Sequence, residues 1–240
     1  MPTSAPANNS VILRYFNLDF LKIVAILTMT IDHFEKLVLK HQLPFLPEIG
    51  RVAFPTFIIL LCFAVTINSR EPLRYSLRLM IAAFISQPFF YYAFETPYVL
   101  NIFYSLGVIS AGLTFLKPYL IKSAWTFWLA SAGLAILALI YYSLQPPFLF
   151  EYNFSGFFLA LCLTTAILRK SPVYLLIALA PLYFLNSKPE SFSWLLIYLP
   201  CFLLLGALSG QRFHFIRRFK LSLYAYYPIH LLLLKYFGSL

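Results

Sequence analysis

The chain has 240 residues, of which 61% are hydrophobic and only 11% are charged. A soluble domain carries about 25% charged residues, and no single protein core could bury this much apolar surface, so the composition excludes a soluble domain. The net charge is +10, but the basic residues lie in short clusters between apolar runs. That pattern is typical of membrane proteins and argues against nucleic acid as a partner.

Residues 1–17 form a polar N-terminal segment, and the first long apolar run follows them directly. A membrane-spanning helix needs about 20 residues, with a range of roughly 17–25. Nine runs are candidates in chain order: residues 18–39, 52–67, 73–94, 100–116, 124–144, 153–168, 172–185, 192–208 and 219–237. The sequence therefore predicts a single-domain, all-α polytopic transmembrane helical bundle over residues 1–240, with about nine spans. Its first run is expected to act as an uncleaved signal anchor.

The basic residues test this count, because cytoplasmic loops carry an excess of Lys and Arg. With nine spans, 13 of the 18 basic residues fall on one side of the membrane. The other side holds Lys36, Lys40, Arg51, Lys188 and Lys235. This asymmetry predicts a cytoplasmic N-terminus and an outer C-terminus. The second, sixth and seventh runs are short, and one that does not cross would give an even number of spans.

The three cysteines, Cys62, Cys162 and Cys201, all lie inside apolar runs. Their spacing suggests no disulfide, and no cluster of Cys and His suggests a zinc site, so no metal is expected. We expect them to act as small packing residues.

The first run carries ionisable residues at a depth where polar groups are costly. Lys22 and His33 are eleven residues apart, close to three helical turns, so they share one helix face with a rise of about 16 Å between them. Asp32 lies about 100° from His33 around the helix and can act on it only through a neighbouring helix or a water. Two simpler readings stay open: His33 as a structural histidine bonded between helices, and Asp32 paired with Lys36.

Three more polar residues reach the outer half of the membrane. Arg51 opens the second run and Asn101 opens the fourth. His230 lies in the last run after Pro228, where a proline can kink the helix toward an interior site. The simpler explanations are an ion pair of Arg51 with Glu48, a helix cap by Asn101, and an interfacial histidine in an aromatic belt.

The cytoplasmic half carries cations instead. Arg70, Arg74 and Arg78 are spaced by four, which places them in one stripe at the start of the third run. Lys22 lies at similar depth. Four cations near an entrance suit a polyphosphate ligand, although the excess of positive charge in cytoplasmic loops explains the outermost of them equally well.

Five segments resemble the TraX-like (F-pilin acetylase) family of bacterial inner-membrane proteins, which are associated with N-terminal acetylation of pilin. They are MTIDH (residues 29–33), GRVAFPTF (50–57), RYSLRL (74–79), NIF (101–103) and YPIH (227–230). The resemblance covers residues 18–234 and is weakest over 145–210. The spacing of Lys22 and His33 also resembles the basic-x-ten-His pattern of the wider transmembrane acyltransferase superfamily.

The resemblance implies an acetyltransferase of the bacterial inner membrane that takes acetyl groups from cytoplasmic acetyl-CoA, its cosubstrate. The acceptor would lie at the outer face and be a pilin amine, another protein or a glycan hydroxyl. Residues that would bind the phosphates of coenzyme A are Lys22, Arg74 and Arg78. Catalytic residues would be Asp32, His33, Arg51, Asn101 and His230.

Each catalytic candidate has an expected role under this resemblance. His33 would act as general base or as a covalent acetyl carrier. Arg51 or Asn101 would stabilise the oxyanion of the tetrahedral intermediate. His230 would orient His33 or relay its proton, and Asp32 would fix the imidazole tautomer through a neighbour or a water.

Two other classes of function fit parts of the pattern. A proton-coupled transporter could use Lys22, Asp32, His33 and His230 as a relay, and proline-broken helices are common in transporters; the lack of repeat symmetry between the two halves argues against it. A non-catalytic membrane partner in pilus assembly would tolerate substitution of the histidines and arginines.

Overall fold

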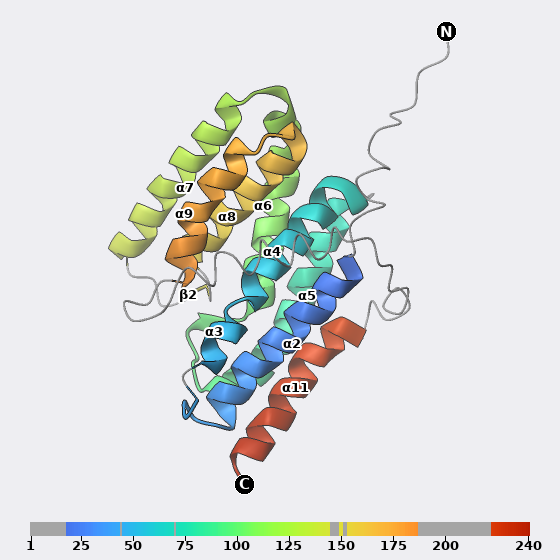
Figure 1. The fold of residues 1–240 in the computed structure, drawn as a ribbon, viewed down its shortest axis with the longest axis vertical. Helices are drawn as coiled ribbons and strands as arrows, with labels where there is room; N and C mark the ends of the chain where they lie inside the picture. Colours follow the sequence, from blue (N-terminus) through green and yellow to red (C-terminus); the bar gives the residue numbers. More distant parts are fainter. Residues whose placement is uncertain (1–17, 44, 70, 145–148, 151–152, 187–221) are drawn as a thin grey trace, which may run out of the picture.

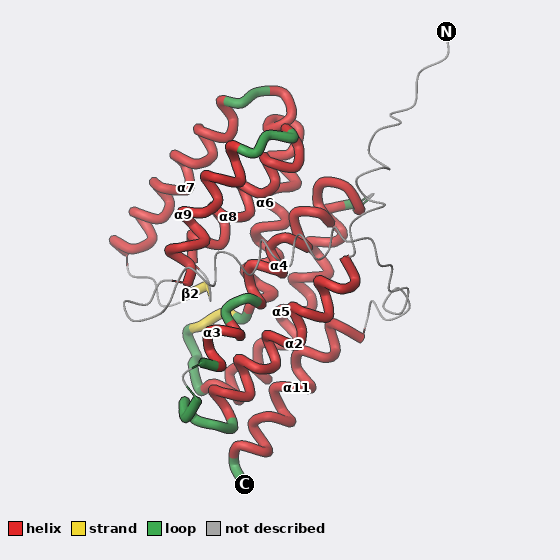
Figure 2. The backbone as a smooth tube through the Cα atoms, in the orientation of Figure 1, coloured by secondary structure: helices red, strands yellow, loops and turns green. Residues whose placement is uncertain are grey.

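The computed structural model describes residues 18–43, 45–69, 71–144, 149–150, 153–186 and 222–240, and these form a bundle of helices (Figures 1 and 2). The long helices are α2 (Leu18–Leu37), α4 (Ala53–Phe63), α5 (Pro72–Phe94), α6 (Ile102–Lys122), α7 (Trp125–Leu144), α8 (Asn153–Arg169), α9 (Val173–Asn186) and α11 (Ser222–Gly238). A short helix, α3 (Leu46–Gly50), precedes α4, and a π-helical turn, η1 (Ala64–Asn68), follows it. Two short parallel strands, β1 (Val99–Leu100) and β2 (Leu149–Phe150), complete the described part.

The all-α prediction is confirmed for the described residues. Eight of the nine predicted runs are helical there, and the remaining one, residues 192–208, lies outside them. Within the described part of the chain, four helices are long and apolar enough to cross a membrane: Leu46–Ile67, Pro72–Phe94, Ile102–Lys122 and Trp125–Leu144. The count of nine spans and the cytoplasmic N-terminus stay predictions.

Two boundaries differ from the prediction. The second run begins at Leu46 and not at residue 52, because α3, α4 and η1 continue one another as a 22-residue apolar helix. Pro47 lies in the first turn of α3, where its missing N–H has no helical partner to lose. The fourth run continues through Pro118 to Lys122.

Exposed apolar side chains identify the lipid-facing surface. On α7 the side chains of Trp125, Leu129 and Leu139 are 75%, 71% and 69% exposed. Apolar surface on this scale does not face water in soluble proteins, so the chain is an integral membrane protein. By contrast, α4 supplies the centre of the core, where Phe54 and Ile58 are completely buried.

Helices α2, α5 and α11 run in the same direction at one side of the bundle (Figure 1). At their C-terminal ends, Lys235 Nζ of α11 donates a hydrogen bond of 2.7 Å to Glu95 Oε1, just after α5. This bond holds the pKa of the Glu95 carboxyl below its usual range. Gly238 packs directly on the backbone of Leu37 in α2, so the two helix ends lie in close contact.

Lys117 has a structural task that the sequence did not indicate. From α6, its Nζ donates hydrogen bonds to the carbonyls of Val65 and Thr66, at 3.1 and 2.9 Å. It thereby satisfies carbonyl groups at the end of the α4–η1 helix. The prediction that the cysteines pack in the core is confirmed for Cys62 and Cys162, which are buried free thiols; Cys201 lies outside the described residues.

Candidate functional site

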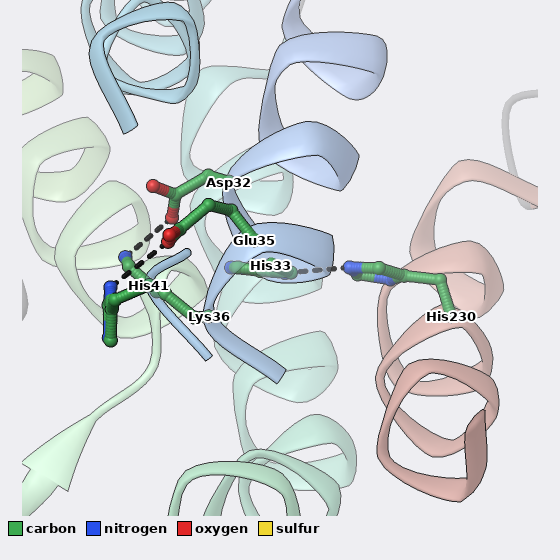
Figure 3. A network of polar contacts seen from close by, with 6 residues as sticks. All are labelled: Asp32, His33, Glu35, Lys36, His41 and His230. Carbon is green, nitrogen blue, oxygen red and sulfur yellow. Dashed lines mark hydrogen bonds and ion pairs between the residues drawn. The ribbon is translucent and has the colours of Figure 1, made fainter. Parts of the chain in front are cut away.

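Two histidines meet inside the bundle. His33 of α2 and His230 of α11 are each only 4% exposed, and His33 Nδ1 lies 2.8 Å from His230 Nε2 (Figure 3). The two histidines, which come from the first and the last predicted runs, are therefore in direct contact. His230 is not an interfacial side chain, so the aromatic-belt explanation of it was wrong.

The hydrogen bonds assign the tautomers of a neutral pair. His230 Nδ1 lies 3.0 Å from the carbonyl oxygen of Tyr226, and a carbonyl can only accept, so this nitrogen carries a proton. His230 Nε2 is then an acceptor, and His33 Nδ1–H donates to it. The proton of neutral His33 therefore lies on Nδ1, which leaves the lone pair on Nε2, at the ring edge away from His230 (Figure 3).

A second contact fixes α11 against α2 one turn before the histidine pair, toward the N-terminal ends of both helices. Thr30 Oγ1 donates to the carbonyl of Ile26, so the Tyr226 hydroxyl, 2.7 Å away, donates to Thr30 Oγ1. The Tyr226 ring also lies parallel to the His230 ring, with centroids 4.9 Å apart. The orientation of His230 is thus set by its own helix.

A small cavity of about 10 Å³ lies beside the histidine pair. Its lining residues come from five helices: Met29, Asp32, His33, Gly50, Ala53, Ile102 and Tyr227. The volume is close to what one water needs. Asp32 and His33 both line this cavity; the link between them through a water stays a prediction.

Asp32 also has the simple partner that the sequence suggested. Lys36 Nζ donates to Asp32 Oδ2 at 2.6 Å, and the Lys36 side chain is 37% exposed. Gly50 packs so closely on Asp32 that a β-carbon at residue 50 would overlap the Asp32 side chain. The glycine of the GRVAFPTF segment is therefore what allows α3 to approach α2.

Arg51 lies directly after the cavity residue Gly50. Its Nη1 donates to Glu48 Oε1 at 2.8 Å, as the sequence suggested. The Arg51 side chain is 18% exposed, so it lies largely within the protein.

Asn101 is a helix cap and a brace between α5 and α6. Its Oδ1 accepts the Phe103 N–H, and its two amide hydrogens donate to Ala83 O and Gln87 Oε1. Gln87 in turn donates to the carbonyl of Val99. Because both amide hydrogens are engaged, Asn101 has no donor left for an oxyanion in this arrangement.

We expect Asn101→Ala to lower the stability of the purified protein. Loss of a helix cap costs about 1 kcal/mol, and each of the lost hydrogen bonds to Ala83 O and Gln87 Oε1 adds about 0.5–1.5 kcal/mol. The thermal midpoint in detergent would report the change. The variant Asn101→Ser retains a capping oxygen and should lose less; equal losses would show that capping does not matter.

The three predicted phosphate-binding cations come from two helices, α2 and α5. Arg74 is exposed and pairs with Glu71 at 2.7 Å. Arg78 is also exposed and lies near the Tyr224 hydroxyl of α11, while Lys22 is half-buried on α2. All three belong to the N-terminal ends of α2 and α5, the end opposite Glu95 and Lys235. Arg70 lies outside the described residues.

The sequence reasoning missed Glu35. This carboxylate is completely buried, and neither of its oxygens accepts a hydrogen bond from the described residues. Its Oε2 lies 3.1 Å from Nδ1 of His41, which is 70% exposed (Figure 3). A signal was available: Glu35 lies one turn after Asp32, about 60° away around the same apolar helix.

Comparison with known families gives one match. Residues 17–237, nearly the whole chain, match the model of the family described as TraX protein. Searches of the curated proteins and of the solved structures found no match.

Proposed function

Because the chain belongs to the TraX family, we propose that it is a membrane-embedded acetyltransferase that uses cytoplasmic acetyl-CoA. The acetyl group passes to an acceptor at the outer face, for which the resemblance to pilin acetylases favours the N-terminal amine of a pilin. The protein would then act in the bacterial inner membrane, next to the pool of pilin before assembly.

The observation that carries this proposal is the buried histidine pair. An α-amino group has a pKa of about 7.7–8.0, so much of it must lose a proton before it can attack. With Nδ1–H committed to His230, the Nε2 lone pair of His33 is available as the general base. His230 acts as a positioning residue, because Tyr226 O fixes its own tautomer.

The chemistry balances with the groups present. His33 Nε2 takes the proton of the acceptor ammonium, and the neutral amine attacks the thioester carbonyl of acetyl-CoA. The C–S bond of the tetrahedral intermediate breaks, and the coenzyme leaves as a thiolate that takes up the second proton lost by the attacking nitrogen as the amide forms. For the developing oxyanion we favour Arg51 over Asn101, whose donors are engaged.

The spacing along α2 supports a donor that enters from the cytoplasmic end. Lys22 and His33 lie on one continuous helix, with a rise of about 16 Å between them. Coenzyme A carries its phosphates at one end and its thioester at the end of a long flexible arm. Phosphates near Lys22, Arg74 and Arg78 would therefore leave the thioester within reach of His33.

The decisive experiment uses proteoliposomes with isotopically labelled acetyl-CoA on one side and a peptide with a free N-terminal amine on the other. We expect label in the peptide, found by mass spectrometry, and none when the peptide's amine is blocked. Movement of a solute without coenzyme A and without a labelled peptide would favour the transporter instead.

We expect Arg78→Ala to raise the apparent KM for acetyl-CoA about 10-fold or more, because a charge-assisted hydrogen bond to phosphate contributes about 1.5–3 kcal/mol. The matched control is Lys122→Ala, which removes an exposed cation at the end of α6. An equal KM in the two variants would refute the phosphate-binding role of Arg78.

A further inference from the structure

A line of aromatic rings connects one of the proposed phosphate-binding residues with the His33 site. It starts at Tyr224 of α11, whose hydroxyl lies near Arg78. The ring of Tyr224 contacts that of Phe103 in α6, with centroids 5.9 Å apart, and the rings of Phe103 and Tyr227 are 5.0 Å apart. The Tyr227 ring lies 6.1 Å from the ring of His33. The line therefore runs, contact by contact, from a cation to the proposed general base.

The same line runs from a partly open surface into the protein. The side chains of Phe103 and Tyr224 are half-buried, whereas Tyr227 is only 2% exposed. Tyr227 lines the small cavity beside His33 together with Ile102, the residue before Phe103 in α6. We call the side chains of Tyr224, Phe103 and Tyr227 the aromatic seam.

The seam lies where α11 meets α6. Helix α11 packs closely on α2 and α5. On the α2 side, a hydrogen bond joins Tyr226 to Thr30, and a second joins the two histidines. Toward α6, in contrast, Phe103 contacts the rings of the seam on α11. The α6 side of α11 thus presents aromatic rings, on which a long, narrow ligand can lie.

The order of side chains along this line matches the order of chemical groups in the proposed donor. Coenzyme A has phosphates at one end, an uncharged arm of methylene and amide groups in the middle, and the thioester at the other end. Arg78 suits the phosphates. The rings of the seam suit the arm, because aromatic faces pack against methylenes and weakly accept amide N–H groups. The enclosed cavity beside His33 is left for the acyl group.

We propose that the aromatic seam is the binding site for the uncharged arm of the donor coenzyme. The arm lies over the half-buried rings of Phe103 and Tyr224, with its phosphates toward Arg78 and its acyl end toward the cavity. The inference rests on the proposed function in taking a coenzyme A thioester as the donor.

Exchange between a thiol in the seam and the disulfide of coenzyme A tests this assignment. In Phe103→Cys, the new thiolate attacks the disulfide and forms a mixed disulfide, and one molecule of coenzyme A leaves as a thiolate that takes up a proton. The protein is held in lipid nanodiscs, and peptide mass spectrometry reads the added mass at residue 103. The small, uncharged 2-hydroxyethyl disulfide reacts by the same chemistry, so the ratio of the two rates corrects for the reactivity and exposure of the thiol.

The matched control is Tyr104→Cys. Tyr104 follows Phe103 in the chain and is also half-buried, but it lines a separate groove with Phe84 and Tyr91 of α5. Binding of the phosphates raises the effective concentration of the coenzyme disulfide at the seam. We therefore expect the ratio of rates to be about tenfold higher at residue 103 than at residue 104.

Two cation variants make the test specific. Arg78→Ala, added to Phe103→Cys, should lower the ratio about tenfold, because the phosphates lose a charged partner. Lys122→Ala removes an exposed cation at the end of α6 and should leave the ratio unchanged. Equal ratios at residues 103 and 104, or equal effects of these two cation variants, would overturn the assignment of the seam.

A second position keeps the test decisive if Phe103→Cys does not fold. Tyr224→Cys, at the other half-buried residue of the seam, is then compared with Tyr104→Cys in the same way. The exchange needs no acceptor and no acyl transfer. Preferential exchange without label in the peptide would keep the seam and refute acetyl transfer, whereas label in the peptide without preferential exchange would overturn the seam alone.

Discussion

His33→Asn is expected to abolish most acetyl transfer while the protein stays folded. Removal of a general base typically lowers the rate 10²–10⁴-fold. The amide nitrogen of asparagine lies near the position of histidine Nδ1, so it can still donate to His230 Nε2 and preserve the bond between α2 and α11. The asparagine has no basic nitrogen at the position of Nε2. The rate of label transfer from acetyl-CoA to the peptide in proteoliposomes measures the loss.

Substitution of His230 separates the role of the general base, His33, from the role of the residue that positions it. His230→Gln removes the ring that fixes the His33 tautomer but leaves His33 itself in place, so we expect a smaller loss than for His33→Asn. Its pH–rate profile should also change, which a purely structural defect would not produce. Parent-like transfer by folded, membrane-inserted His33→Asn would show that His33 is a structural histidine, the simpler reading of the sequence.

Gly50→Ala is expected to have the largest effect on the architecture of the site. The new β-carbon would overlap the side chain of Asp32, and neither helix can yield without losing the cavity wall. Overpacking of this kind costs about 1–3 kcal/mol and occasionally more. We expect a lower thermal midpoint and loss of transfer, since Asp32 and Gly50 both line the cavity beside His33.

A matched glycine gives the control. A β-carbon at Gly133 of α7 meets no atom within 4 Å, so Gly133→Ala should keep full activity and raise helix stability by about 0.5–1 kcal/mol. If Gly50→Ala proved as harmless as Gly133→Ala, the close approach of α3 to α2 would not matter for the site.

The bilayer explains why so much could be predicted from sequence. With no water to satisfy backbone groups, apolar runs of spanning length must become helices, and eight of the nine runs are helical among the described residues. Polar side chains are costly inside the bilayer. Asp32, His33 and His230 could therefore be selected as candidates from their positions within apolar runs. The simple partners of Asp32, Arg51 and Asn101 were also predicted correctly, because they lie within a few residues on the same helix or at its end.

What could not be predicted depends on contacts between distant segments. His33 and His230 are 197 positions apart, and only the parallel packing of α11 against α2 brings His33 Nδ1 to 2.8 Å from His230 Nε2 and decides the tautomers. Asn101 was named as an oxyanion donor because the sequence does not show that Gln87, from α5, occupies its amide. From the sequence, Lys117 counted only as one of the 13 basic residues on one side of the membrane. The carbonyls that it binds belong to another helix, so this role could not be predicted.

Composition and run length alone predict the membrane environment and the helical class of this protein, because length, apolarity and rise per residue are properties of a single helix. The packing of the helices then sets which ionisable residues meet. It joined His33 to His230, closed the cavity with Gly50 and buried Glu35 beneath His41, because side-chain contacts depend on helix packing and orientation that no single run encodes.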